Sequence, residues 1–486
     1  MSPAPSQRVV RGDWQTPAAL ARAVVDRVAA LTPAPACVVE PTCGAGSFLA
    51  AAAARFPGAQ LRGYEIDPTH VAAAQALVTC PRGQVVQADV FSLDWAREAA
   101  DWPAPVLVLG NPPWVTSAAL GRHGGDNRPA REAAGLRGLA ARTGRSNFDV
   151  SEWLVLRLLR ALAGRTATVA VLLKASVARR VLVELARAGL PARPRGLWQI
   201  DAARHFGARV DAGLLVVDSL DSRDSLGSLV VGASAAADAG AALRCPIYPD
   251  LAATAPTRQI ALADGELIAD LEAHARSLHL RGASAPEWRS GVKHDCAAAM
   301  EIQGPHDLED SHVYPLLRAA ELARGEATPR RWLVLPQTRL GEDTAGLAAR
   351  APRTWAHLQR HAAALAARKS SIYRGQPPFA VFGVGAYTFA PFKVAISGLH
   401  KQPRFVVVPP HRGRPVVLDD TSYFLPFADE AAAREAHALL CSPPARDFLE
   451  ARAFWADKRP IHKGMLQRLD LARLRDDPRA RLIAGP

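Results

Sequence analysis

The sequence has no uncharged apolar run long enough to cross a bilayer. Its first residues, MSPAPSQRVVRGDWQTP, contain no apolar segment of the signal-peptide type, so we expect a cytoplasmic protein without membrane contact. Cysteines are few and scattered, and the absence of any CxxC pair argues against a zinc site and against a disulfide framework. The six cysteines are Cys37, Cys43, Cys80, Cys245, Cys296 and Cys441.

The sequence also lacks internal repeats and heptads, and its 486 residues are too many for a single hydrophobic core. Apolar residues make up 49% of the chain, which is typical of a globular protein. Residues 219–242 are rich in Ser, Gly, Ala and Asp, and aromatic, Gly and basic residues dominate after residue 281. We therefore expect a first domain over residues 1–240, a linker or peripheral region over 241–280, and a second domain over 281–486.

Acidic residues are scarce over residues 351–420, where ten Lys and Arg share the window with only Asp419 and Asp420. The whole chain carries a formal net charge of +13 and has a pI near 10.0. A polyanion is the natural partner of such a surface. A composition biased toward Ala and Arg explains the total charge equally well, but it explains less well why the charge is concentrated in one window.

Short apolar runs alternate with helical stretches in the first part of the chain. Residues 36–56 predict a strand, a Gly-containing turn and an Ala-rich helix, and residues 60–78 repeat this plan with an acidic turn. Further strands are expected over residues 84–93, 105–114, 166–176 and 212–220, with a helix over 151–163. This alternation predicts an α/β fold with a doubly wound, mostly parallel sheet, followed by a mixed α/β or mostly β second domain. Ligands bind such sheets at the carboxyl ends of the strands.

Three features stand at the ends of successive predicted strands. Gly44 and Gly46 allow a tight turn and a close approach to a ligand. Glu65 follows 21 residues after Gly44, where an acid binds ribose hydroxyls, and Asp89 ends the third strand, where it can accept a hydrogen bond from an adenine amino group. The missing third glycine argues against a nicotinamide dinucleotide. Asp89 alone is better explained as a turn or cap acid, but the three features in order favour a nucleoside-containing cofactor.

The segment LVLGNPPWVT, residues 107–116, stops a buried strand abruptly. Two prolines cannot continue a hydrogen-bonded ladder, so the strand over residues 106–109 must end there. The Asn111 amide and the Pro112 carbonyl are left beside the flat ring of Trp114. A simple strand-terminating turn is the alternative, and the three features upstream make it the weaker one.

Together these motifs resemble those of S-adenosylmethionine-dependent methyltransferases, and among them the amino-methyltransferases of DNA. The order of Thr-Pro, Gly-rich loop, Asn-Pro-Pro-Trp and a large C-terminal region resembles the gamma class. The resemblance implies a Rossmann-like methyltransferase domain over residues 1–240, with S-adenosyl-L-methionine as cofactor, and a DNA target-recognition domain over 281–486. It implies that the cofactor site contains Thr16, Pro17, Glu40, Pro41, Cys43, Gly44, Ala45, Gly46, Glu65, Ile66, Asp89, Val90 and Asn111.

The catalytic residues implied by this resemblance are Asn111, Pro112, Pro113, Trp114 and Phe206. The exocyclic amine of adenine is a poor nucleophile, because its lone pair is delocalised into the ring. Acceptors on the Asn111 side chain and the Pro112 carbonyl would favour a tetrahedral nitrogen. Trp114 would stack on a base flipped out of the duplex, and Phe206, within ARHFGARVDAGLLVV, is the candidate for a second ring. An ordinary core phenylalanine is an equally good interpretation of Phe206.

Basic residues alternate with aromatic residues in the acid-poor window. The expected DNA contacts are Lys369, Arg374, Lys393 and Lys401, which lie among Tyr373, Phe382, Tyr387, Phe389 and Phe392. Such interleaving is typical of a nucleic-acid-binding face. The alternative is that the aromatic residues are core and the basic residues a solvated surface.

The favoured function is therefore methylation of the N6 amino group of adenine in duplex DNA, in a restriction–modification or phage-defence context with possible partner proteins of that system. Cytosine N4 methylation uses the same geometry and is the closest alternative. Glutamine N5 methylation of a protein and a non-catalytic DNA-binding subunit are further alternatives. Because the Thr-Pro motif begins at Thr16, we expect no preceding nuclease domain, and so modification without cleavage.

Overall fold

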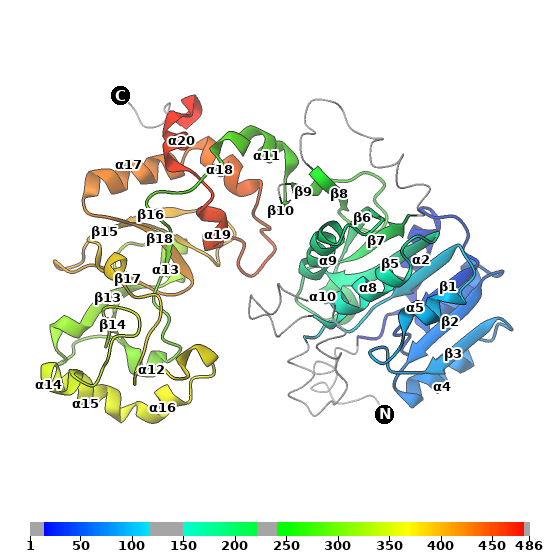
Figure 1. The fold of residues 1–486 in the computed structure, drawn as a ribbon, viewed down its shortest axis with the longest axis horizontal. Coiled ribbons are helices and arrows are strands. Elements are labelled where there is room, and N and C mark those ends of the chain that lie inside the picture. Colours follow the sequence, from blue (N-terminus) through cyan, green and yellow to red (C-terminus); the bar gives the residue numbers. More distant parts are fainter. Residues whose placement is uncertain (1–13, 117–148, 221–240, 264, 481–486) are drawn as a thin grey trace. The chain divides into compact units, whose positions relative to one another are not determined.

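The computed structural model describes residues 14–116, 149–220, 241–263 and 265–480 (Figure 1). The chain divides into two compact units, Met1–Ile268 and Ala269–Pro486. Each of the buried hydrophobic clusters falls within one unit, so each unit has a core of its own. Within the described ranges, no helix is both long enough and apolar enough to cross a membrane.

The first unit is built on a ten-stranded sheet in the order β10-β9-β8-β6-β7-β5-β4-β1-β2-β3. Its strands are β1 (Cys37–Glu40), β2 (Gln60–Glu65), β3 (Gly83–Gln87), β4 (Val106–Gly110), β5 (Ala167–Lys174), β6 (Ala192–Ile200), β7 (Ala212–Ser219), β8 (Ala241–Tyr248), β9 (Arg258–Ala263) and β10 (Glu266–Ile268). Strands β3, β2, β1, β4 and β5 pair in parallel, and β7 runs antiparallel between β5 and β6. The predicted doubly wound, mostly parallel sheet is thereby confirmed.

The register of the central strands brings their carboxyl ends to one edge of the sheet. Leu107 of β4 lies between Val38 of β1 and Thr168 of β5. Every residue of β1 and β4 is buried, which explains why these strands read as continuous apolar runs rather than alternating ones. The residues that follow β1, β2, β4 and β5 therefore meet where ligands bind such sheets.

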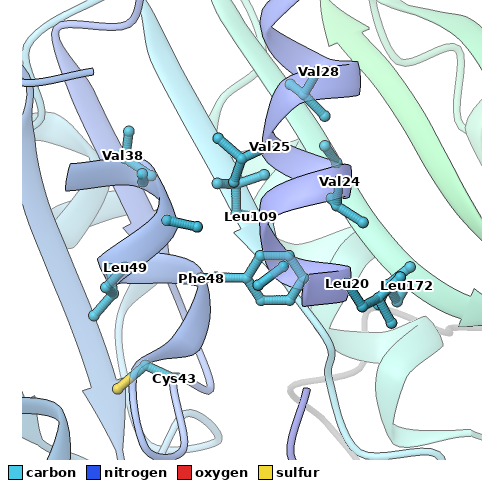
Figure 2. Packing of buried hydrophobic residues seen from close by; sticks show 14 of the residues in the cluster. Leu20, Val24, Val25, Val28, Val38, Cys43, Phe48, Leu49, Leu109 and Leu172 are labelled. Carbon is cyan, nitrogen blue, oxygen red and sulfur yellow. The ribbon is translucent and has the colours of Figure 1, made fainter. Parts of the chain in front are cut away.

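Helices cover the sheet of the first unit. They are α2 (Ala18–Ala29), α3 (Ser47–Arg55), α4 (Pro68–Leu77), α5 (Trp95–Ala100), α8 (Val150–Ala161), α9 (Ala175–Arg187) and α10 (Ala202–Phe206). Helix α2 buries Leu20, Val24 and Val28 on one face because these residues repeat every four positions. Figure 2 shows Phe48 of α3 in the same cluster as Leu109 of the sheet and the apolar face of α2. This packing holds the loop before α3 at the sheet edge.

Residues 241–280, which we expected to form a linker or peripheral region, contain the strands at one edge of the sheet of the first unit. Strands β8, β9 and β10 extend the sheet of the first unit, with Leu197 of β6 beside Ile247 of β8. The second unit begins at Ala269, so the boundary differs from the predicted positions at 240 and 281. Ile260 and Leu262 are buried in β9. An apolar run this short does not identify a strand until the strand that pairs with it is known.

The second unit contains two four-stranded sheets, in the orders β11-β18-β15-β16 and β12-β14-β13-β17. The strands are β11 (Arg289–Ser290), β12 (Glu301–Ile302), β13 (Val313–Leu317), β14 (Arg331–Val334), β15 (Phe392–Ser397), β16 (Phe405–Val408), β17 (Val417–Leu418) and β18 (Ser422–Phe427). Pairing is antiparallel except between β13 and β17.

Helices accompany both sheets of the second unit, so the expected mixed α/β architecture is confirmed. They are α11 (Leu271–Ser277), α12 (Ala297–Met300), α13 (Ala319–Ala323), α14 (Leu347–Arg350), α15 (Pro352–Arg360), α16 (Ala362–Ala366), α17 (Glu430–Leu440), α18 (Pro443–Glu450), α19 (Lys463–Leu466) and α20 (Leu471–Asp476), with short 3-10 turns at η1 (Leu278–Leu280), η2 (Asp310–His312), η3 (Ser371–Tyr373) and η4 (Ala386–Phe389). Helix α17 is capped by Asp429 and packs Ala433, Ala436 and Leu440 into the core around Trp288.

Candidate active site

The Asn-Pro-Pro-Trp segment leaves the sheet beside the end of β1. A Cβ placed on Gly110 would lie 3.7 Å from Cδ of Pro41 and 4.0 Å from Cγ of Glu40. The end of β4 therefore lies close to the start of the Gly-rich turn. The structure brings Glu40, Pro41 and Asn111 together, as the strand order predicted.

The Asn111 side chain is held in one orientation. Its Nδ2 donates a hydrogen bond to the carbonyl oxygen of Trp14 at 2.9 Å. A carbonyl oxygen can only accept, so the amide nitrogen must face Trp14 and the amide oxygen must face away. Asn111 Oδ1 is buried and has no hydrogen-bond partner among the described residues. The site thus contains a fixed acceptor without a donor.

Trp114 and Phe206 lie against each other. Their ring centroids are 5.3 Å apart with an interplanar angle of 73°, and Trp114 Nε1 donates to the Leu172 carbonyl at 3.2 Å. Phe206 ends α10, just before Gly207 in the left-handed conformation. The two predicted rings are neighbours, but they meet edge to face. A base held between them in a parallel sandwich would require one ring to turn.

Glu65 organises the Gly-rich turn. Its Oε2 accepts a hydrogen bond from the Gly44 amide at 2.9 Å, and its Oε1 accepts from the amides of Ile66 and Asp67, each at 2.9 Å. Gly44 and Gly46 adopt φ angles of +51° and +88°, which other residues rarely adopt. Ile66 is 49% exposed, so its apolar side chain is accessible next to the Glu65 carboxylate, which is held in place by these hydrogen bonds.

Glu40, at the end of β1, is 3% exposed, and its Oε2 has no partner in the part of the chain that the structure describes. Burial raises the pKa of this carboxyl well above its usual value, and the charge of Glu65 raises the pKa further. Thr42 Oγ1 is also buried without a partner among the described residues. Buried polar atoms in folded proteins are nearly always hydrogen-bonded, so this group of atoms is typical of a ligand site.

The other cofactor residues predicted from the sequence lie around the same edge. Asp89 Oδ1 accepts a hydrogen bond from the Phe91 amide at 2.9 Å, so Asp89 shapes the turn after β3, and Val90 is buried behind it. Burial raises the pKa of the Cys43 thiol, which keeps it neutral. Pro17 caps α2, and Thr16 precedes it. Ala45 lies in the turn, where its amide is already bonded to Gln15.

Two contributions from the N-terminal segment were missed. Gln15 Oε1 accepts a hydrogen bond from the Ala45 amide at 3.0 Å, and the Trp14 carbonyl fixes the Asn111 amide. Trp14 and Gln15 directly precede Thr16 and Pro17, so their position next to that motif was the only available signal. A backbone carbonyl leaves no trace in the residue type, and only the structure could identify it.

A search of protein-family models finds no match. A type II methyltransferase, M.NspV of Nostoc sp. (strain ATCC 29411 / PCC 7524), is 34% identical over 479 residues, which cover 95% of this chain and 96% of that protein. The chain belongs to the type II methyltransferase family. This membership confirms the resemblance to S-adenosylmethionine-dependent methyltransferases of restriction–modification type.

Other relatives of this methyltransferase match less of the chain. The type II methyltransferase M.XamI of Xanthomonas campestris pv. amaranthicola is 35% identical over 112 residues, 23% of this chain and 21% of that protein. A methyltransferase subunit of the type I restriction–modification system from Streptococcus thermophilus aligns with 15% identity and a TM-score of 0.32, covering 48% of this chain and 46% of that one. The M protein of the type I restriction enzyme EcoKI aligns with 12% identity and a TM-score of 0.30, covering 43% and 45%.

In the second unit of the methyltransferase, the burial of Lys393 contradicts one of the expected DNA contacts. Lys393 is 1% exposed in β15, its Nζ donates to the Ala390 carbonyl at 2.6 Å, and burial lowers its pKa to about 7. A lysine in the core cannot reach a phosphate. Lys369 and Arg374 are exposed, as is Lys401, whose Nζ donates to the Asp457 carbonyl at 3.1 Å. Sequence could not separate Lys393 from these residues, because all four lie among aromatic residues.

Proposed function

We propose that this methyltransferase transfers a methyl group from S-adenosyl-L-methionine to the N6 amino group of adenine in duplex DNA. In this proposal it is the modification enzyme of a restriction–modification or phage-defence system, with a nuclease of the same system as a possible partner. The observation that carries the proposal is the Asn111 amide, whose nitrogen is bonded to Trp14 while its buried oxygen has no partner among the described residues.

The target amine is the natural donor for that oxygen. Asn111 Oδ1 and the Pro112 carbonyl would accept the two N–H bonds of the amine and so free its lone pair for attack on the methyl carbon. Because the amide cannot turn without losing its bond to Trp14, the acceptor is in place before the substrate arrives. Such preorganisation lowers the barrier without a metal or a covalent nucleophile.

The unpaired acid at the end of β1 supports the choice of cofactor. Glu40 Oε2 would accept a hydrogen bond from the ammonium of the methionine moiety, and this charge would bring the carboxyl back to its ionised form. Glu65 would hold the ribose hydroxyls, with Ile66 against the adenine ring and Asp89 near its amino group. The sulfonium of the bound cofactor supplies an activated methyl group.

The choice of duplex DNA rests on the rings and on the charge of the chain. A base inside a duplex cannot reach a buried site, so it must be flipped out, and stacking on Trp114 and Phe206 would offset part of that cost. Lys369, Arg374 and Lys401 of the second unit are exposed cations suited to phosphates, and we propose residues 269–486 as the target-recognition domain.

Cytosine N4 methylation is the second candidate. The two acceptors would engage an amino group with two N–H bonds, and the exocyclic amine of cytosine is such a group. Analysis of the methylated nucleoside separates the two candidates directly, because N6-methyladenine and N4-methylcytosine are different products.

The test is transfer of labelled methyl from S-adenosyl-L-methionine to duplex DNA, with analysis of the product nucleosides and with Asn111→Ala as the variant. We expect N6-methyladenine from the native protein and a loss of at least about 100-fold in kcat from Asn111→Ala. N4-methylcytosine as the product would replace adenine with cytosine in the proposal. Measurable cofactor binding with no transfer to any DNA would refute DNA as the substrate of the isolated chain.

A further inference from the structure

A buried ion pair lies at the same edge of the sheet and takes no part in the contacts described so far. Lys174 Nζ lies 2.9 Å from Asp149 Oδ2, with 24% of the Lys174 side chain and 4% of the Asp149 side chain exposed. Asp149 precedes α8 and Lys174 ends β5. The pair therefore joins two elements that flank the Asn-Pro-Pro-Trp segment.

Asp149 is attached to the chain that leaves this segment. It forms an antiparallel bridge with Thr116, and the Val150 amide donates to the Val115 carbonyl at 2.9 Å. The Asp149 carboxylate also caps α8 through the amide and hydroxyl of Ser151. Residues 115–116 are thus held to the start of α8 at the position where Asp149 meets Lys174.

Lys174 is attached to the other side of the target pocket. It lies two residues beyond Leu172, whose carbonyl accepts the Trp114 indole N–H. Lys174 also pairs with Ala212 at the start of β7, and the Ala175 amide donates to the Asp211 carbonyl at 2.8 Å. Asp211 lies five residues after Phe206. The lysine thus anchors the strand that supports Trp114 and the segment that carries Phe206.

We propose that Asp149 and Lys174 are positioning residues, whose ion pair clamps the Asn-Pro-Pro-Trp segment between β5 and α8 and so sets where the target base is received. This inference rests on the proposed function, because it assigns the clamp to the pocket for the flipped base. A buried ion pair adds little net stability over apolar residues of the same size. We therefore expect this pair to affect the position of the Asn-Pro-Pro-Trp segment more than the stability of the fold. A displacement of about 1 Å at the reacting centre can cost about 100-fold in rate.

The chain offers a matched control ion pair in the same region of the first unit. Arg180 of α9 pairs with Glu152 of α8 at 2.5 Å, so this ion pair joins the helices that follow Lys174 and Asp149. The test pair of substitutions is Asp149→Asn with Lys174→Met, which removes both charges, and asparagine caps helices as well as aspartate does. The control pair is Glu152→Gln with Arg180→Met. Lys174→Arg tests whether a cation of different shape restores the clamp.

Hydrogen exchange in the protein without DNA tests the clamp itself. In the Asp149→Asn, Lys174→Met protein we expect faster exchange in peptides covering residues 106–116 and at the Val150 amide, and we expect unchanged exchange there in the control. Equal protection of these peptides in the test and control proteins would overturn the clamp, whatever the result with DNA. The proposed function has a different test, since it is refuted if the native protein transfers no methyl group to DNA.

Methyl transfer and base flipping test what the clamp does. With 2-aminopurine at the target position, we expect the test protein to lose most of the fluorescence change seen on binding. We expect kcat to fall about 10- to 100-fold, cofactor and DNA affinities to stay within about twofold, and Lys174→Arg to recover part of kcat. A tenfold loss of DNA affinity with kcat unchanged would instead make Lys174 a phosphate contact and overturn the positioning role.

Discussion

Buried carboxyl groups occur in both units of this methyltransferase, and they differ in their partners. Glu40 in the first unit and Asp419 in the second unit both have a pKa raised chiefly by burial. Asp419 accepts hydrogen bonds from the Ala319 amide at 3.0 Å, the Ser422 hydroxyl at 2.5 Å and the Thr421 hydroxyl at 2.9 Å. Glu40 leaves Oε2 without a partner among the described residues.

The difference shows that burial and a raised pKa do not by themselves mark a functional site. Asp419 ties the residues around β17 and β18 to the start of α13, and its oxygens are used by the fold. Glu40 lies beside the loop that carries Asn111, and each of these two side chains has a buried oxygen without a partner among the residues that the structure describes. A buried acid whose hydrogen bonds are complete is typical of structure, and one with an open oxygen is typical of a binding site.

The largest effect on stability is expected at Asp419. Asp419→Ala would leave the Ala319 amide and two hydroxyls buried without their acceptor, so we expect the free energy of unfolding to fall by about 3–5 kcal/mol. Asp419→Asn keeps an acceptor oxygen and should cost less than half as much. Denaturant unfolding monitored by tryptophan fluorescence measures both changes. Equal, small losses of unfolding free energy in the two variants would show that the hydrogen bonds of Asp419 do not stabilise the fold. Asp419 would then no longer differ from Glu40 in this respect.

Glu40→Gln should act in the opposite direction on stability. A raised pKa means that the folded state holds its proton where the unfolded chain has lost it, so stability is full below the ordinary glutamate pKa and falls as the pH rises through the folded value. Glutamine removes this loss. At pH 7 we expect unfolding free energy to rise by about 1–2 kcal/mol, with a flatter pH dependence. Affinity for S-adenosyl-L-methionine should fall by at least about 30-fold, because the ammonium loses a charged acceptor.

Calorimetric titration would measure the change in cofactor affinity of Glu40→Gln. Thermal unfolding between pH 5 and 8 would measure its change in stability. A companion variant is Thr42→Val, which changes no charge and removes a second buried oxygen that has no partner among the described residues. Unchanged cofactor affinity in Glu40→Gln would contradict the assignment of Glu40 to the cofactor site.

Lys393→Met should change stability alone, without an effect on ligand binding. Burial lowers the pKa of this lysine to about 7, so the folded state binds fewer protons than the unfolded chain between that value and the ordinary lysine pKa, and stability rises with pH across this range. Methionine of similar length removes the cost of the buried ammonium and loses one hydrogen bond to Ala390. We expect a gain of about 1–2 kcal/mol near pH 7 and a smaller slope from pH 7 to 9.

The same substitution tests whether Lys393 belongs to the core or to the proposed DNA-binding surface. DNA affinity should be unchanged in Lys393→Met, measured by fluorescence anisotropy at fixed salt. A salt-dependent loss of affinity would return Lys393 to the phosphate contacts and overturn its correction.

Much of the first unit could be predicted from local patterns. The runs ending at Glu40, Glu65 and Gly110 are strands, as expected, because a short run with buried apolar residues that ends at an acid, a glycine or a proline has few alternatives in a parallel sheet. The last strands of this sheet, β8 to β10, were not predicted as strands, because their place in the sheet is defined by their partner strands. In the second unit the composition predicted the mixed α/β class, but no sequence pattern indicated two separate sheets.

The sequence by itself determined the order of the motifs and the family, because the Gly-rich turn, Glu65 and Asn-Pro-Pro-Trp are local signals fixed by backbone requirements at strand ends. Only the tertiary structure decided which atoms of these motifs are open. The Trp14 carbonyl fixes the Asn111 amide across 97 positions, and the core of the second unit buries Lys393 while Lys369 stays exposed. Exposure and hydrogen bonding depend on what folds over a side chain, and residues distant in sequence supply that cover.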